Sequence, residues 1–91
     1  MAEDPEYQAT RAALEKTYRE RLALLAPDTR ARIEQDLALI RGAHEDIRRA
    51  LARDPGSHVL MELLQSTTEQ EFNLYSTVGR ATEPFVPRTR T

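Results

Sequence analysis

IEQDLALIRGAHEDIRRAL, residues 33–51, is the stretch that decides the fold of this chain. Within it, one stripe recurs at alternating spacings of four and three residues: Ile33, Leu37, Ile40, His44, Ile47 and Leu51. This spacing places every member on one face of a helix that packs against a second helix, as in a coiled coil. The stretch therefore predicts a long helix, and it indicates no substrate, reaction or ligand.

A turn signal follows this helix at residues 54–57, Asp-Pro-Gly-Ser. Proline ends a helix, glycine permits a tight turn, and Ser57 is a favourable N-cap for the next helix. Two long helices joined by so short a turn run antiparallel and form a hairpin. Counting outward from the turn pairs Leu51 with Leu60 and His44 with Thr67. The next helix then contributes these residues to the hairpin seam: Leu60, Leu64, Thr67, Glu71, Leu74 and Val78.

The sequence indicates a single all-α domain over residues 1–80. Of the chain's 91 residues, 31% are charged and 5% are aromatic, which suits amphipathic helices better than a β-sheet. Acidic residues and Pro5 favour a shorter first helix, and Pro27 marks the start of the second. We expect helices at about residues 5–25, 27–53 and 57–79, followed by a flexible tail at 81–91.

The two long helices carry a further stripe of apolar and small residues, which we expect to be an association face: Leu39, Gly42, Ala43, Ala50, Met61, Phe72 and Tyr75. Either the first helix folds back over this stripe, or two hairpins pair into a dimeric four-helix bundle. The first helix is short, and Arg11 and Arg21 interrupt its apolar stripe. These interruptions favour the homodimer.

Three seam residues, His44, Thr67 and Glu71, form the most polar group in the expected hairpin. A His–Glu pair can exchange protons or bind a metal, but a metal site needs three or four ligands and catalysis needs a concave pocket. A polar layer that fixes the register of the hairpin is the simpler interpretation. We therefore predict no catalytic, cofactor-binding or metal-binding residues, no cofactor and no enzymatic activity.

Charge and hydropathy narrow the range of partners. The formal net charge is -2, and acidic residues interleave with Arg48, Arg49 and Arg53, so no nucleic-acid interface is expected. No apolar run approaches the roughly 18 residues that a bilayer span requires. The chain has no cysteine, which excludes disulfides and thiolate metal sites. The expected partners are a second copy of the chain and other proteins.

Three segments resemble the C-terminal, extracytoplasmic region of bacterial membrane-anchored anti-sigma factors. They are LLAPDTRARIEQDLALI at residues 24–40, IRRALARDP at 47–55 and LMELL at 60–64, and the similarity extends over residues 18–75. In that family, a cytoplasmic zinc-binding domain that binds the sigma factor precedes one membrane span and such a hairpin. This chain has neither the His/Cys zinc motif nor the span. The resemblance therefore implies a soluble fragment without sigma-binding residues, in which Met1 is not the native start.

The resemblance implies a regulatory role in the periplasm. The hairpin would receive an envelope signal or a protein partner and thereby control transcription across the membrane, through a change in bundle packing or in exposure to a protease. Two alternatives stay open. One is a cytoplasmic adaptor that docks a partner's amphipathic helix in a groove, and the other is a metal-responsive helical sensor built on His44 and Glu71.

Overall fold

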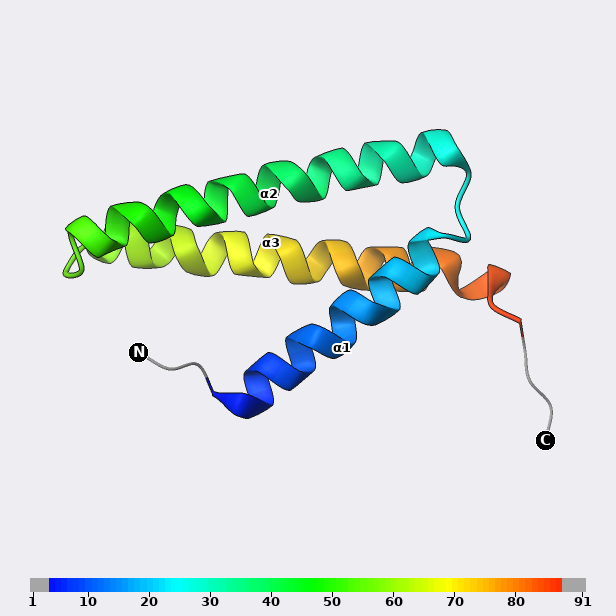
Figure 1. The fold of residues 1–91 in the computed structure, drawn as a ribbon, viewed down its shortest axis with the longest axis horizontal. Helices are drawn as coiled ribbons and strands as arrows, with labels where there is room; N and C mark the ends of the chain where they lie inside the picture. The colour runs from blue at the N-terminus through cyan, green and yellow to red at the C-terminus, as the bar shows by residue number, and fades with distance from the viewer. Residues whose placement is uncertain (1–3, 88–91) are drawn as a thin grey trace.

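A computed structural model describes residues 4–87 of the chain. It consists of three α-helices, α1 (Pro5–Leu22), α2 (Pro27–Arg53) and α3 (His58–Thr82), and a short 3-10 helix, η1 (Glu83–Phe85) (Figure 1). No strand occurs among these residues. The predicted all-α class with three helices is confirmed.

The helix starts follow from local chemistry. The side chain of Asp4 accepts a hydrogen bond of 2.9 Å from the amide of Glu6 and so caps α1. Pro27 occupies the first position of α2, where a missing N–H costs nothing. The Oγ of Ser57 accepts a hydrogen bond of 3.2 Å from the amide of Leu60, as expected for the N-cap of α3.

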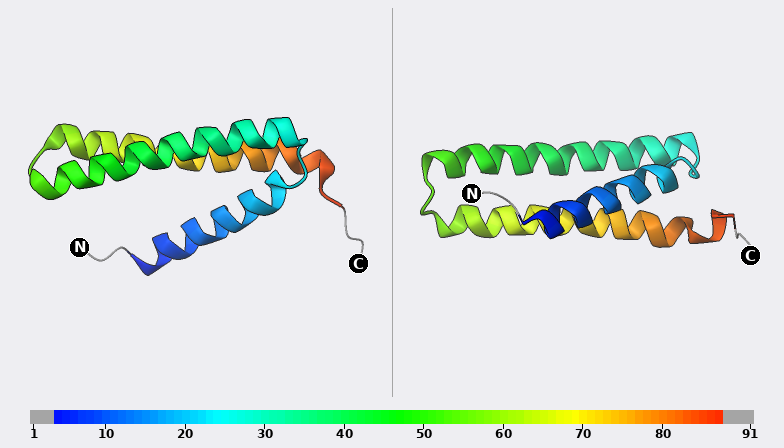
Figure 2. Two further views of the ribbon diagram at one scale, coloured as in Figure 1. Left: turned by 45° about the horizontal axis from the view of Figure 1, so that its top comes forward. Right: turned by 60° about the horizontal axis from the view of Figure 1, so that its bottom comes forward.

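Helices α2 and α3 lie side by side and run in opposite directions from the turn that joins them (Figures 1 and 2). The predicted pairing of His44 with Thr67 is present, since Nδ1 of His44 lies 3.2 Å from the Oγ1 of Thr67. Toward the turn, Leu51 and Leu60 are only half-buried. The hairpin alone is thus too thin to bury its own seam completely.

Helix α1 folds back and packs along α3, so the first of the two arrangements left open by the sequence occurs within one chain. The rings of Tyr18 and Tyr75 have centroids 4.9 Å apart, and those of Tyr7 and Phe72 are 6.0 Å apart. Helix α1 crosses the hairpin at an angle and diverges from it toward the N-terminus (Figure 2). It therefore covers only part of the hairpin.

The apolar core lies at the end of the hairpin away from the turn. Each helix contributes to this core, whose buried side chains are Tyr18, Leu22, Leu37, Tyr75 and Val78. Partly buried apolar side chains such as Ile33 and Leu74 pack around it. Because α1 does not reach the turn, the other half of the hairpin has no third helix over its seam (Figure 1).

Two boundaries differ from the sequence-based prediction. Helix α1 ends at Leu22, three residues early, and α3 continues to Thr82, three residues late. Thr82 is fully buried and donates a hydrogen bond of 2.6 Å to the carbonyl of Val78. Arg21 forms an ion pair of 3.1 Å with Glu83. Residues 81–85, which the sequence analysis assigned to a flexible tail, thus belong to α3 and η1, and residues 88–91 of that tail lie outside the described residues.

Candidate functional site

The most deeply buried charge in the described chain is the carboxylate of Glu71, of which 2% is exposed. Helix α3 places it at the point where all three helices meet. From α1, the Nη2 of Arg11 donates hydrogen bonds of 3.2 and 3.3 Å to its two oxygens. From α2, the Nε of Arg41 lies 3.5 Å from Oε2. Glu71 therefore joins α1 to α2 through α3.

Two further side chains complete this group. The hydroxyl of Tyr75 donates a hydrogen bond of 2.5 Å to Glu71 and accepts one of 2.9 Å from Nη2 of Arg41. Glu15 lies 3.5 Å from nitrogens of both Arg11 and Arg41. We call these five residues the ionic junction. Its two arginines balance its two glutamates, so the buried carboxylate leaves no net charge uncompensated.

The junction shifts the proton affinities of its members. Burial alone would raise the pKa of Glu71, but the hydrogen bond from Tyr75 and the charge of Arg11 outweigh burial and hold this pKa below its ordinary value. Burial and the hydrogen bond to Glu71 raise the pKa of Tyr75 to about 12. Near neutral pH the carboxylate is thus ionised and the phenol protonated. The junction therefore holds the three helices together through ion pairs and hydrogen bonds.

His44 and Thr67 form a separate polar layer in the hairpin seam. The hydroxyl of Thr67 donates a hydrogen bond of 2.9 Å to the carbonyl of Leu64, so it accepts from the Nδ1–H of His44. The Nε2 of His44 is then unprotonated, and it is buried without a hydrogen-bond partner among the described residues. Burial, assisted by the charge of Arg48, lowers the pKa of His44. The imidazole is therefore neutral at pH 7.

The structure separates the residues predicted as an association face. Phe72 and Tyr75 pack against α1, and Tyr75 is 3% exposed. In contrast, Leu39 is 69% exposed and Met61 53%. Gly42 and Ala43 are exposed on α2, and Ala50 is half-buried. The predicted stripe thus contains a part covered by α1 and two uncovered parts, one on each flank of the hairpin.

One uncovered flank lies away from α1 and carries exposed apolar side chains beside polar ones. A surface cavity of about 480 Å³ lies there between α2 and α3, and its lining residues are Leu39, Ile40 and Leu74 together with Asp36, Gln70, Asn73 and Thr77. Toward the turn, α3 adds Val59, 66% exposed, and Leu63, 46% exposed. We call this flank the open face and define it by its apolar members: Leu39, Ala43, Ala50, Val59, Leu63 and Leu74.

The sequence did not identify the ionic junction as a unit. The sequence pattern places Glu71 in the hairpin seam with His44 and Thr67, and in that pattern Arg11 interrupts the stripe on the first helix. Tyr18 follows Glu15 by three residues and Arg11 by seven, so all three share one helix face. That shared face was the available signal. It indicates that Arg11 and Glu15 are directed toward the same helix as Tyr18, where their side chains are 28% and 26% exposed.

Among residues 4–87, no three His, Asp or Glu side chains gather as ligands for a metal ion. No helix within these residues is long and apolar enough to cross a membrane. No protein-family model, curated protein or solved structure matches this chain. Its geometry is therefore the basis of the functional argument.

We expect Glu71→Gln to lower the free energy of unfolding by about 2–3 kcal/mol. The substitution keeps the shape of the side chain but leaves the charges of Arg11 and Arg41 with only Glu15 as a counter-ion. Urea unfolding followed by circular dichroism at pH 7 measures the loss. Glu69→Gln, on the exposed side of the same helix, is the matched control and should change stability by less than about 0.5 kcal/mol. Equal effects of the two substitutions would contradict a stabilising junction.

The same variants separate the contribution of Glu71 to the pH dependence of stability from the contributions of other carboxylates. The pKa of Glu71 is lower in the folded state than in the unfolded chain. As the pH falls, the Glu71 carboxylate of the unfolded chain therefore binds a proton before that of the folded protein does. Its contribution to stability is full above the ordinary value of 4.5 and is lost as the pH falls toward the folded-state pKa. The stability of wild type and Glu69→Gln should therefore fall more steeply between pH 5 and 3 than that of Glu71→Gln.

We expect His44→Leu to raise the free energy of unfolding by about 0.5–1 kcal/mol at pH 7. Leucine removes a buried nitrogen that has no partner, while Thr67 keeps its hydrogen bond to Leu64. Since the pKa of His44 is lowered by folding, the wild type loses stability as the pH falls below 6.5, and the variant does not. Thermal unfolding at pH 7.5 and 5.5 measures both effects. His58→Leu, at the exposed start of α3, is the control, and a marked loss of stability in His44→Leu would contradict this account.

Proposed function

We propose that this chain is a non-catalytic regulatory module that acts by helix–helix association, and that it pairs with a second copy of itself through the open face. The observation that carries the proposal is the exposure of large apolar side chains on this flank, above all Leu39, Val59 and Leu63. Exposed apolar groups gathered on one surface are typical of an interaction site. Pairing two hairpins there would form a four-helix bundle with one α1 on each outer side.

The uncharged stripe of α3 supports a second copy as the occupant of the open face, and the charged residue that lines the same cavity from α2 is Asp36. In a two-fold symmetric contact each patch meets an identical patch, so a patch whose charges have one sign would face charges of the same sign. The stripe that α3 contributes to this flank consists of Val59, Leu63, Ser66, Gln70, Asn73, Leu74 and Thr77, all of them uncharged. A self-complementary contact therefore carries no repulsion along α3. Its small and apolar residues permit close approach of the helices.

The regulatory part of the proposal combines this surface with the resemblance to anti-sigma factors. A hairpin of that kind would lie in the periplasm, as part of a longer inner-membrane protein, and would convey a signal to a sigma-binding domain. Helix α1 would be the responding element, because it diverges from the hairpin toward its N-terminus, while the ion pairs of Arg11 and Arg21 and the buried side chains of Tyr18 and Leu22 attach the rest of it. A change in its angle is a discrete structural difference that a partner can stabilise.

We expect the purified chain to have twice its monomer mass of 10.4 kDa in sedimentation equilibrium at micromolar concentration. Leu63→Glu places a carboxylate in the apolar contact on both copies and should weaken dimerisation at least about tenfold. Leu24→Glu makes the same change at another exposed leucine, outside the open face, and should leave the dimer intact. A monomer at all concentrations, or equal losses in both variants, would contradict pairing through the open face.

The anti-sigma proposal has a separate test in the gene itself. We expect the open reading frame to continue upstream of Met1 into a membrane-spanning segment, and a sigma-factor gene to lie beside it. Deleting the codons for residues 5–87 from the native gene should alter the response of sigma-dependent transcription to envelope stress, measured with a promoter reporter. Translation that begins at Met1 without upstream coding sequence would contradict this role and favour a cytoplasmic adaptor.

A further inference from the structure

The second uncovered flank of the hairpin holds a groove on the turn-proximal half of α3. It has a volume of about 520 Å³, and its floor and walls include Met61, Glu62, Leu64, Thr68, Glu69 and Phe72. None of these residues belongs to the open face. The groove begins at His58, next to the turn, and ends at Phe72, where Tyr7 of α1 packs. We call it the acidic groove.

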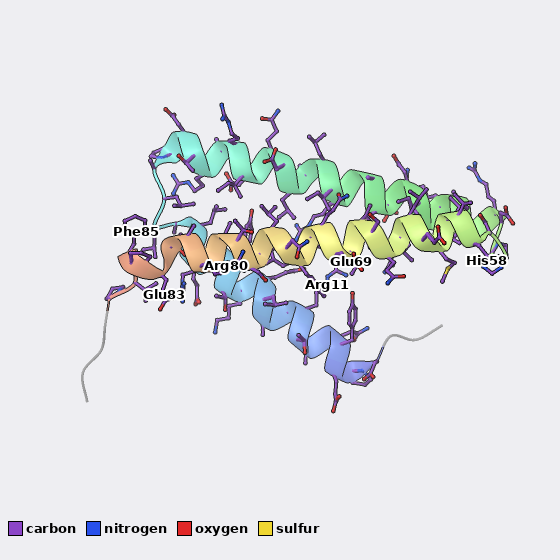
Figure 3. The ribbon with its side chains drawn as sticks, turned by 180° about the vertical axis from the view of Figure 1, so that it is seen from behind. Arg11, His58, Glu69, Arg80, Glu83 and Phe85 are labelled. Carbon is purple, nitrogen blue, oxygen red and sulfur yellow. The ribbon has the colours of Figure 1, made fainter. Side chains whose placement is uncertain are left out.

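The groove lies on the flank of α3 that α1 covers farther along. Helix α1 packs on Phe72 and Tyr75 and then diverges, so the α3 surface nearer the turn continues without a covering helix (Figure 3). Figure 3 shows His58 at the far end of α3, beyond the reach of α1, and Glu69 near the middle of α3, close to Arg11 of α1. The groove is thus the vacant continuation of a helix-binding surface that the chain already uses.

The groove combines an apolar floor with a rim of one charge sign. Met61 is 53% exposed, and Leu64 and Phe72 are half-buried, so apolar surface is accessible along about three helical turns. Glu62 and Glu69 are exposed on the rim, and α3 has no lysine or arginine between Ser57 and Gly79.

We infer that the acidic groove binds an amphipathic helix of a partner protein, with an apolar stripe directed to Met61 and Phe72 and with lysine or arginine on both edges of that stripe. The apolar stripe would extend the contact that α1 makes with α3. The basic edges would meet the glutamates of the rim. A second copy does not suit the groove, because two such rims would place glutamates against glutamates. The inference extends the proposed interaction function to a second surface and a different class of partner.

The probe for this inference is a synthetic amidated peptide of about four helical turns, with leucines at i, i+4, i+7 and i+11 and lysines on both edges of the stripe. A control peptide carries glutamates in place of the lysines. Fluorescence anisotropy of the labelled peptides against the full chain should show binding of the basic peptide only. The affinity should fall as the salt concentration rises, because the rim charges are exposed to solvent.

Two pairs of variants locate the binding surface. Glu69→Lys should weaken binding of the basic peptide about fivefold, whereas Glu20→Lys, an exposed glutamate of α1 outside the groove, should leave it unchanged. Met61→Ala should weaken binding by a similar factor, while Val59→Ala, on the open face of the same helix, should not. Equal binding of the two peptides, or equal effects within either pair, would overturn the inference.

Sedimentation of the same variants separates this inference from the proposed homodimer. Loss of peptide binding in Glu69→Lys with an unchanged dimer supports two independent surfaces. Conversion of the chain to a monomer by Met61→Ala, but not by Leu63→Glu, would show that a second copy occupies the groove and would overturn the inference. A dimer that binds neither peptide would overturn only the groove, and the open face would remain supported.

Discussion

The carboxylate of Glu71 is the constraint on which the arrangement of the three helices depends. A charge with 2% exposure is tolerated only where opposite charges and hydrogen bonds surround it, and here these groups come from all three helices. Arg11 and Arg41 can both reach this carboxylate only if α1 packs on the hairpin with Arg11 next to Glu71. The junction therefore specifies where α1 docks, while the rings of Tyr18 and Tyr75 supply apolar burial beside it.

Much of this fold follows from sequence, for reasons that individual residues make clear. The seam around His44 predicted the hairpin register because side chains on one helix face can meet only one set of partners across a short turn. Pro27 and Ser57 determined helix starts through their own backbone chemistry. Such signals are local, and they need no knowledge of the third helix.

The docking of α1 was harder to predict because its signal is not local. Arg11 and Arg21 interrupt the apolar stripe of α1, yet in the structure each of them attaches α1 to α3. An arginine between apolar residues has two possible fates, exposure to solvent or pairing with a buried acceptor. Only the position of Glu71, sixty residues away, distinguishes them. The same interaction explains why Phe72 and Tyr75, expected on an association face, are covered within one chain.

The contact of Arg21 with the end of α3 has a mechanical consequence. Its guanidinium donates a hydrogen bond of 2.8 Å to the carbonyl of Gly79 and pairs with Glu83, so the C-terminal end of α1 is anchored while its first turn diverges. At 1.5 Å per residue, the 18 residues of α1 form a lever about 27 Å long. A rotation of about 10° at the anchored end would move the far end by about 5 Å, and it would also displace Arg11 from Glu71 in the ionic junction. That end carries Tyr7, which packs on Phe72 at the end of the acidic groove. A ligand in the groove would therefore act on α1 at the end farthest from Arg21.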